Sequence, residues 1–416
     1  MYIADLHIHS RYSRATSKNI TIESLSAAAK EKGINLLGTG DCLHPLWLDE
    51  LELKLRPEAP GIFSFNGVNY ILQTEISNIY TQGGKLRKIH TVLLFPDFDT
   101  VRKLQNKLSH YGSLTADGRP IFGLSLRDTI KIIIDINPDI MIIPAHIWTP
   151  WFSLFGSNSG FDSIEECCGE YKKYITALET GLSSDPPMNW MVSELDDYIL
   201  VSNSDAHSTG NLGREANVFA EKLDYYQLKK VLESKDRKKF LYTIEFFPEE
   251  GKYHYDGHRN CNVSMHPEKA IEERNICPIC GNPLTIGVLH RVYDLADRPY
   301  GFRHEKAIPY KRLVPLKEII AEVLKIGVSS KKVEQMRKIL INSIGPEFYI
   351  LLEAPIDDII KYSGIEDMGL AVEAVRKEKV KIKPGFDGVF GEVKIDIESL
   401  KNQKNKKKEG GELTLF

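Results

Sequence analysis

The sequence predicts an α/β protein: a distorted seven-stranded β/α barrel, followed by a small cysteine-rich module and a helical C-terminal domain. Three observations support this fold class. Short apolar segments alternate with helical segments up to residue 245, a pattern typical of strands joined by crossover helices. Histidines and acidic residues stand near the ends of the apolar segments. A segment rich in Cys, His, Gly and Pro then precedes a run of helical patterns.

Seven apolar segments are predicted as strands of the first region, residues 1–245. They are residues 2–8, 34–40, 70–77, 88–95, 140–147, 175–181 and 198–206. Residues 21–33 are typical of the intervening helices, because Thr21 and Ser24 can cap the start and Gly33 can end the helix. We expect a parallel arrangement in which the carboxyl ends of the strands form the site, as in closed β/α barrels.

The first predicted strand contains the motif Asp5-Leu-His7-Ile-His9. Side chains two residues apart on a strand point to the same side, so two imidazoles with this spacing can bind one metal ion. Of the seven histidines before residue 250, six fall in clusters of this kind and only His110 does not. This distribution indicates a metal site.

Nine side chains are candidate ligands at the predicted strand ends. They are His7, His9, Asp41, His44, Glu75, His90, His146, Asp205 and His207. This number suits two or three divalent ions, such as zinc, magnesium or manganese, with Glu75 as a bridging carboxylate. We predict that Asp205, Glu75, His7 and His9 are the catalytic core. Glu179, Asp185 and Asn189 lie near another strand end, where they could orient ligands, bind a phosphate or cap a turn.

Residues 246–305 form the predicted zinc-binding module. His258 and Cys261 are separated by fifteen residues from Cys277 and Cys280, which is the spacing of a structural zinc site. The fourth ligand stays open, because His266 or His254 could replace His258.

The rest of the chain is predicted as a helical domain with a terminal hairpin, residues 306–395, and a flexible basic tail, residues 396–416. The chain ends in Leu413-Thr-Leu-Phe416, an aliphatic residue three positions before an aromatic one. This spacing is similar to that of sliding-clamp-binding motifs, so residues 410–416 are predicted to contact a clamp.

The segments DLHIHS, GTGD, KIH, PAH and SDAH together resemble the PHP superfamily of phosphoesterases. The resemblance implies a seven-stranded barrel with up to three metals. It places the first among His7, His9, Glu75 and Asp205, the second among Glu75, His90 and His146, and the third near His207 with Asp41 or His44. Arg14 and Cys42 depart from the pattern of many members, in which the corresponding residues serve the third metal.

Longer segments resemble the endonuclease Q family across residues 1–395, among them GTGDCLHPLWL, SNSDAHSTGNLGREAN, KYHYDGHRNC and CPICGNPLTIGVLHRVYDLADRP. This resemblance implies a DNA repair enzyme that nicks DNA on the 5′ side of deaminated bases (hypoxanthine, uracil, xanthine) and abasic sites. Such enzymes commonly extrude a base from the stack. We expect Trp148, Trp151 and Phe152 to contact the extruded base, and Arg214 to contact a phosphate.

Composition limits the alternatives. The net charge of −3 argues against a uniformly basic surface, and no apolar run approaches the roughly 20 residues of a membrane helix. Without a secretion signal or a disulfide framework, we expect a cytoplasmic, nucleoid-associated protein. Two other interpretations stay open: a PHP-type small-molecule phosphatase, and a DNA-binding scaffold with an inactive site.

Overall fold

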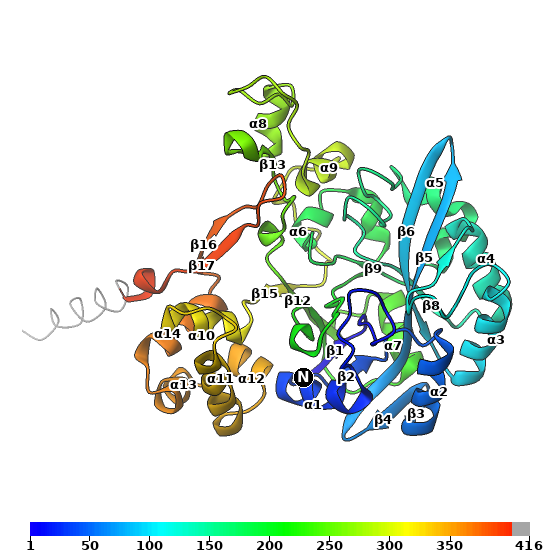
Figure 1. Cartoon of the computed structure of the whole chain (residues 1–416), viewed down its shortest axis with the longest axis horizontal. Helices are drawn as coiled ribbons and strands as arrows, with labels where there is room; N and C mark the ends of the chain where they lie inside the picture. Colours follow the sequence, from blue (N-terminus) through cyan, green and yellow to red (C-terminus); the bar gives the residue numbers. More distant parts are fainter. Residues whose placement is uncertain (402–416) are drawn as a thin grey trace, which may run out of the picture.

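The structure is a computed structural model that describes residues 1–401. The predicted clamp contact at residues 410–416 lies outside the described residues. A mixed α/β region built on one large sheet occupies most of the molecule, and a narrow extension and a helical bundle lie beside it (Figure 1). In residues 1–401, no helix has the length and apolar character needed to cross a membrane.

The largest sheet in the described part of the chain has eleven strands. One path through it runs β15, β12, β11, β1, β2, β5, β4, β3, and β6, β7 and β8 join through β5 and β6. Its strands are β1 (Tyr2–Asp5), β2 (Leu36–Gly38), β3 (Arg56–Ala59), β4 (Ile62–Phe65), β5 (Val68–Gln82), β6 (Lys85–Phe95), β7 (Ile121–Phe122), β8 (Met141–Pro144), β11 (Ala216–Phe219), β12 (Phe240–Glu245) and β15 (Tyr310–Arg312).

Each of the seven predicted segments contains a strand, but the prediction of a parallel sheet is wrong. β1, β2 and β5 pair in parallel, whereas β6 is antiparallel to both β5 and β8. The reason is the two-residue turn Gly83-Gly84, with φ of 61° and 73°, which joins β5 directly to β6. A turn with positive φ at both central residues matches the twist of the two strands of a hairpin. A connection of two residues is also too short to contain the crossover helix that a parallel pair requires.

The predicted closed barrel of seven strands is not confirmed. Among residues 1–401, β9 (Leu178–Glu179) and β10 (Leu200–Val201) pair with each other in a separate two-stranded sheet. The segment before β9 is connected to β8 by the isolated bridge between Ile142 and Ile175. The barrel therefore stays a prediction.

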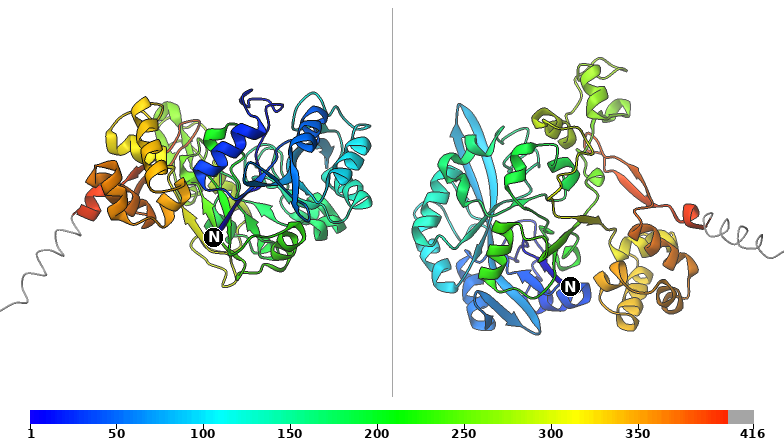
Figure 2. Two further views of the ribbon diagram at one scale, coloured as in Figure 1. Left: turned by 90° about the horizontal axis from the view of Figure 1, so that it is seen from below. Right: turned by 180° about the vertical axis from the view of Figure 1, so that it is seen from behind.

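Helices cover the outer side of the sheet. α3 (Phe98–Leu108), α4 (Leu126–Ile136) and α5 (Ile164–Cys168) line β5, β6 and β8 (Figures 1 and 2). α3 buries Val101, Leu104 and Leu108 from one face, and burying each such side chain contributes about 1.5–3 kcal/mol. The remaining helices of this region are α1 (Ile22–Lys32), α2 (Pro45–Lys54), α6 (Pro186–Asn189) and α7 (Tyr225–Ser234).

The caps predicted for the first helix are confirmed. Thr21 and Ser24 form a reciprocal capping box at the start of α1, in which each side chain accepts from the other residue's backbone N–H. Gly33 ends the helix in the left-handed conformation, with φ of 87°.

Beyond the sheet, the chain forms the extension and the bundle. The extension contains β13 (Asp256–His258), β14 (Val263–Met265), α8 (Pro267–Glu272) and α9 (Val288–Leu295). The bundle contains α10 (Leu316–Leu324), α11 (Lys331–Ser343), α12 (Glu347–Leu352), α13 (Ile356–Ser363) and α14 (Glu366–Arg376).

The predicted terminal hairpin forms from β16 (Val380–Lys383) and β17 (Glu392–Ile395). It reaches from the bundle to the extension (Figure 1), where Asp387 accepts hydrogen bonds from Arg259 N and Thr285 Oγ1. The bundle also contacts α1, because Lys32 pairs with Glu347 at 2.8 Å. The predicted domain boundaries stay predictions.

Candidate metal centre

Four side chains from three separate segments converge at one end of the large sheet. His7 and His9 follow β1, Glu75 lies on β5, and Asp205 follows β10. One ligand atom from each lies within 4.8 Å of all the others. The alternation expected of the first motif holds, because Leu6 and Ile8 are buried in the hydrophobic core.

The unpartnered atoms of this first group fit a cation. His9 Nε2 lies 3.1 Å from Asp205 Oδ1 and 3.2 Å from Glu75 Oε2. His7 Nε2, His9 Nε2 and Asp205 Oδ1 are buried and form no hydrogen bond with a described residue. Buried polar atoms without partners are rare and costly, and a divalent ion would satisfy these three together.

A second group shares Glu75 with the first. Glu75 Oε1 lies 2.8 Å from His90 Nδ1 and 3.1 Å from His146 Nε2, while Oε2 faces the first group. His90 comes from β6 and His146 from the segment after β8. Imidazole and carboxylate donors of this kind suit zinc or manganese. The structure thus brings together the residues predicted for two ions.

The carboxylates of the two groups favour the ionised form, whereas the carboxylates beside His7, His9 and His146 outweigh burial and raise the pKa of these three imidazoles. Burial alone would raise the pKa of Glu75, but the nearby charges of His90 and Arg119 outweigh it and hold this pKa well below its usual value. Burial lowers the pKa of His90 to about 4 against the opposing effect of Glu75. Burial would also raise the pKa of Asp205, yet the adjacent imidazoles of His9 and His7 outweigh it and lower this pKa. Ionised carboxylates and a neutral imidazole are the forms that bind metals.

Two further carboxylates hold the histidine rings from behind. Glu179 accepts from His7 Nδ1 at 3.0 Å, from the backbone N–H of His146 at 2.9 Å and from Asn203 Nδ2 at 2.9 Å. Asp41 accepts from His9 Nδ1 at 2.9 Å. Carboxylates on the second ring nitrogen fix the orientation of the nitrogen that faces the metal. Of the roles left open for Glu179, the geometry favours orientation of a ligand.

The structure does not assemble the third group of the sequence analysis. Asp41 is occupied by His9 and by Ser10, and it joins no metal-type group of the described residues. His44 precedes α2 and its ring stacks on Tyr12 at 4.1 Å. His207 directs Nδ1 to the carbonyl oxygen of Asp205 at 2.9 Å. The ligand roles of Asp41, His44 and His207 therefore stay predictions without a common site.

The extension contains a separate cluster of residues that can bind a metal ion. His258, Cys261, Cys277 and Cys280 offer ligand atoms within 4.8 Å of one another. Burial would raise the pKa of Cys277, but backbone N–H groups of Cys280 and Ile279 outweigh it and lower this pKa to about 6, which favours the thiolate that binds zinc. His266 is not in the group; it starts α8 and accepts from Glu268 N. The geometry thus favours His258 as the fourth ligand.

The residues predicted to contact substrate divide into buried and accessible ones. Trp148 is buried, stacks on Phe155 and donates to Asn189 Oδ1 at 2.8 Å, so its contact with an extruded base stays a prediction that this structure does not favour. Phe152 stands 4.7 Å from the ring of His90, at the metal groups. Trp151 is 49% exposed, with Lys88 Nζ 4.9 Å from its ring.

Two arginines have contacts that were not expected from the sequence. Arg214, predicted to contact a phosphate, donates through Nε to the carbonyl oxygen of Ser204 at 2.9 Å. Arg119, which sequence reasoning missed, donates to Glu75 Oε2 at 2.9 Å. Its only sequence signal is a charged residue in the turn Asp117-Gly-Arg-Pro, just before β7.

Comparisons with known proteins identify the family. Residues 315–379 match the family model "MJ0043 C-terminal domain". The chain is 30% identical to YqxK of Bacillus subtilis over 412 residues, 94% of this chain and 98% of that protein. It is 34% identical to MJ0043 of Methanocaldococcus jannaschii over 257 residues, which is 59% of this chain and 31% of MJ0043.

Two crystal structures resemble nearly the whole chain. The lesion-specific endonuclease PfuEndoQ of Pyrococcus furiosus superposes with a TM-score of 0.85 and 34% identity, over 96% of each chain. The chain belongs to the endonuclease Q family. A second family structure, Endonuclease Q in complex with a 27-mer duplex carrying an abasic lesion at the active site, has a TM-score of 0.83 and 35% identity over 96% of this chain and 98% of the other. As an endonuclease Q family member, the chain is an endonuclease, a hydrolase of phosphodiester bonds.

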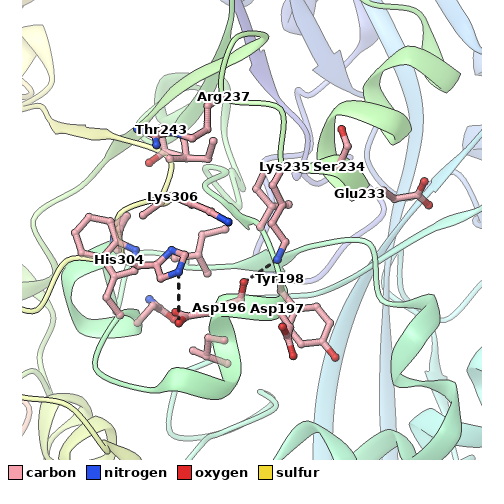
Figure 3. Close-up of a pocket in the computed structure, with 18 residues that line it drawn as sticks. Asp196, Asp197, Tyr198, Glu233, Ser234, Lys235, Arg237, Thr243, His304 and Lys306 are labelled. Carbon is pink, nitrogen blue, oxygen red and sulfur yellow. Dashed lines mark hydrogen bonds and ion pairs between the residues drawn. The ribbon is translucent and has the colours of Figure 1, made fainter.

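A cavity in this endonuclease Q family member is separate from the metal groups. It has a volume of about 550 Å³ and none of the nine predicted ligands lines it (Figure 3). Within its lining, Asp196 pairs with His304 at 3.7 Å and the backbone carbonyl of Asp196 accepts from Lys235; Asp196 also pairs at 2.6 Å with Arg298, which is not a lining residue.

Proposed function

We propose that this chain is a metal-dependent endodeoxyribonuclease that nicks DNA on the 5′ side of deaminated bases and abasic sites. The observation that carries the proposal is the shared carboxylate of Glu75, which joins two buried groups of histidine and acidic ligands at one end of the sheet. The likeness to the endonuclease Q complex with an abasic duplex supports DNA as the substrate.

The residues fit two divalent ions of zinc, magnesium or manganese in this centre, and one zinc ion in the extension. When bound, divalent ions neutralise the phosphate and acidify a bound water. His7, His9 and Asp205 would hold one ion, His90 and His146 the other, and Glu75 would contribute one oxygen to each. Glu179 and Asp41 would fix the orientation of the imidazole rings of His7 and His9 through their hydrogen bonds to Nδ1.

The lesion would be recognised beside these groups. Deaminated bases pair poorly and abasic sites lack a base, so opening the duplex costs less there than at a normal pair. Phe152, next to His90, and Trp151, exposed at the rim, offer aromatic faces on which a base can stack. The charge of Lys88 over the Trp151 ring favours a nearby backbone phosphate.

The proposal is tested with duplexes that carry uracil, hypoxanthine, an abasic site or only normal bases, incubated with the protein and Mg²⁺ or Mn²⁺. We expect a nick on the 5′ side of each lesion, with 3′-hydroxyl and 5′-phosphate ends, and no nick in the normal duplex. Asp205→Asn should abolish nicking. Hydrolysis of free phosphate monoesters alone would indicate a phosphatase, and binding without cleavage a scaffold; either result would contradict the proposal.

A further inference from the structure

Arg119 lies against the carboxylate that the two metal-type groups share. Its Nη1 donates to Glu75 Oε2 at 2.9 Å, and its side chain is 23% exposed. The guanidinium of an arginine stays protonated in proteins, and the buried carboxylate of Glu75 is the ion-pair partner of Arg119. A permanent positive charge therefore stands between the metal-type groups and solvent.

The backbone around Arg119 is fixed from several sides. The N–H of Arg119 donates to Asp117 Oδ1 at 3.1 Å, and the carbonyl oxygen of Pro120 accepts from Ser77 N on β5 at 2.9 Å. Gly118 donates to the carbonyl oxygen of Tyr12 at 3.0 Å. A Cβ at Gly118 would lie 2.4 Å from Asp41 Oδ2, so only glycine allows this close approach. The guanidinium is held in place before any substrate binds.

Arg119 still has donors to offer. The hydrogen bond to Glu75 uses Nη1 alone. In the described part of the chain, Nε and Nη2 donate to no residue. A guanidinium presents its donors as a planar fork that matches the oxygens of a phosphate. Arg214 differs in position, since its Nε contacts the carbonyl oxygen of Ser204 and, among the described residues, it pairs with none of the metal-type ligands.

We infer that Arg119 is a catalytic residue that binds a non-bridging oxygen of the scissile phosphate. Its positive charge would stabilise the negative charge that builds on the phosphoryl oxygens during transfer, while Glu75 keeps it in place. This inference rests on the proposed function, because it assumes that the metal groups act on a phosphodiester.

The test compares wild type with Arg119→Gln and Arg119→Lys, with Arg14→Gln as the matched control. Arg14 pairs with Asp117 of the same turn at 3.3 Å, but it is 75% exposed and has no contact with Glu75. Four properties are measured on the Mn²⁺-loaded protein: bound metal per chain, the melting temperature, the affinity for inorganic phosphate by calorimetry, and the kinetics (kcat and KM) of nicking an abasic duplex.

We expect Arg119→Gln to keep the wild-type metal content and melting temperature. Its kcat should fall by about 10²–10³-fold, the cost of removing one donor to transition-state charge, and its affinity for phosphate should fall about tenfold. Arg119→Lys should recover part of both losses, since it restores the charge without the fork. Arg14→Gln should behave as wild type.

Three results would overturn the inference. The first is nicking by Arg119→Gln at a rate within threefold of wild type, and the second is binding of phosphate as tight as that of wild type. The third is loss of bound metal from Arg119→Gln, which would mean that Arg119 only positions Glu75. A wild-type protein that nicks no lesion duplex would refute the proposed function instead. The phosphate titration would still decide the role of Arg119, because it requires no DNA cleavage.

Discussion

Replacing Glu179 by glutamine tests whether the carboxylate behind His7 controls the metal groups. One carboxylate oxygen accepts from His7 Nδ1 and Asn203 Nδ2, and the other accepts from His7 Nδ1 and from the backbone N–H of His146. An amide has the same shape but only one accepting oxygen. Whichever way it is turned, its NH₂ group faces an N–H donor of Asn203 or His146.

The expected magnitudes follow from these contacts. One buried donor left without an acceptor costs about 1–3 kcal/mol, so the free energy of unfolding of the metal-free protein should fall by that amount. Removing the carboxylate partner of a metal-binding histidine typically weakens metal binding 10–100-fold, which corresponds to about 1.4–2.7 kcal/mol. Nicking at limiting Mn²⁺ should fall in proportion, and a large excess of Mn²⁺ should restore part of it.

The assay combines urea unfolding of the metal-free protein with a titration of Mn²⁺ monitored by calorimetry. Glu165→Gln is the control, because Glu165 lies on the exposed surface and pairs only with Lys172 at 2.7 Å. If Glu179→Gln binds Mn²⁺ within twofold of wild type, the carboxylate does not orient His7 for metal binding and the reasoning fails.

Three other perturbations give independent checks. Burial raises the pKa of Glu245 to about 7 from an ordinary 4.5, so the folded state keeps a proton that the unfolded chain releases. The free energy of unfolding should therefore fall between about pH 4.5 and pH 7, by up to about 3 kcal/mol, and Glu245→Gln should flatten this dependence in urea titrations; an unchanged slope would count against it. Trp151→Ala should leave the melting temperature unchanged, since the side chain is exposed, while fluorescence anisotropy shows about 1–3 kcal/mol weaker binding of lesion duplexes. Equal affinity for lesion DNA would exclude stacking on Trp151. Cys280→Ser should lower the zinc content by one ion per chain, measured by mass spectrometry, and expose residues 246–305 to protease, and retention of that ion would contradict the predicted zinc site.

The position of the site could be predicted from the sequence because strand ends meet in space. His7, His9, Glu75 and Asp205 are separated by up to about two hundred residues, yet each follows or lies on a predicted strand. Period-two alternation placed both histidines of the first motif on one side, and the structure keeps that arrangement although β1 ends at Asp5.

The contacts of individual side chains could not be predicted in this way. Asp41 can bind a metal or orient His9, and only the 2.9 Å contact between them distinguishes the two roles. Trp148 and Trp151 are three residues apart in one loop, but one is buried and the other exposed, because the loop folds back on itself and packs Trp148 against Phe155.

The antiparallel direction of β6 was predictable from the residues of the turn that precedes it. Gly83-Gly84 between two apolar runs is typical of a two-residue hairpin turn, and it indicates an antiparallel β5–β6 pair. Strands β11, β12 and β15 were missed for a different reason: short strands are recognised by their pairing partners, which the sequence does not display.

Glu75 has a consequence for how the protein acquires its ions. Its two oxygens face different groups, Oε2 towards His7 and His9 and Oε1 towards His90 and His146. Neutralising this carboxylate from one side changes the attraction that remains for a cation on the other. In the proposed two-metal centre, occupancy of the two groups would therefore be thermodynamically coupled, and each ion would change the affinity for the other by the same factor. Metal-binding isotherms of this protein should depart from those of two independent sites, and a substitution at Glu75 should alter both binding steps together.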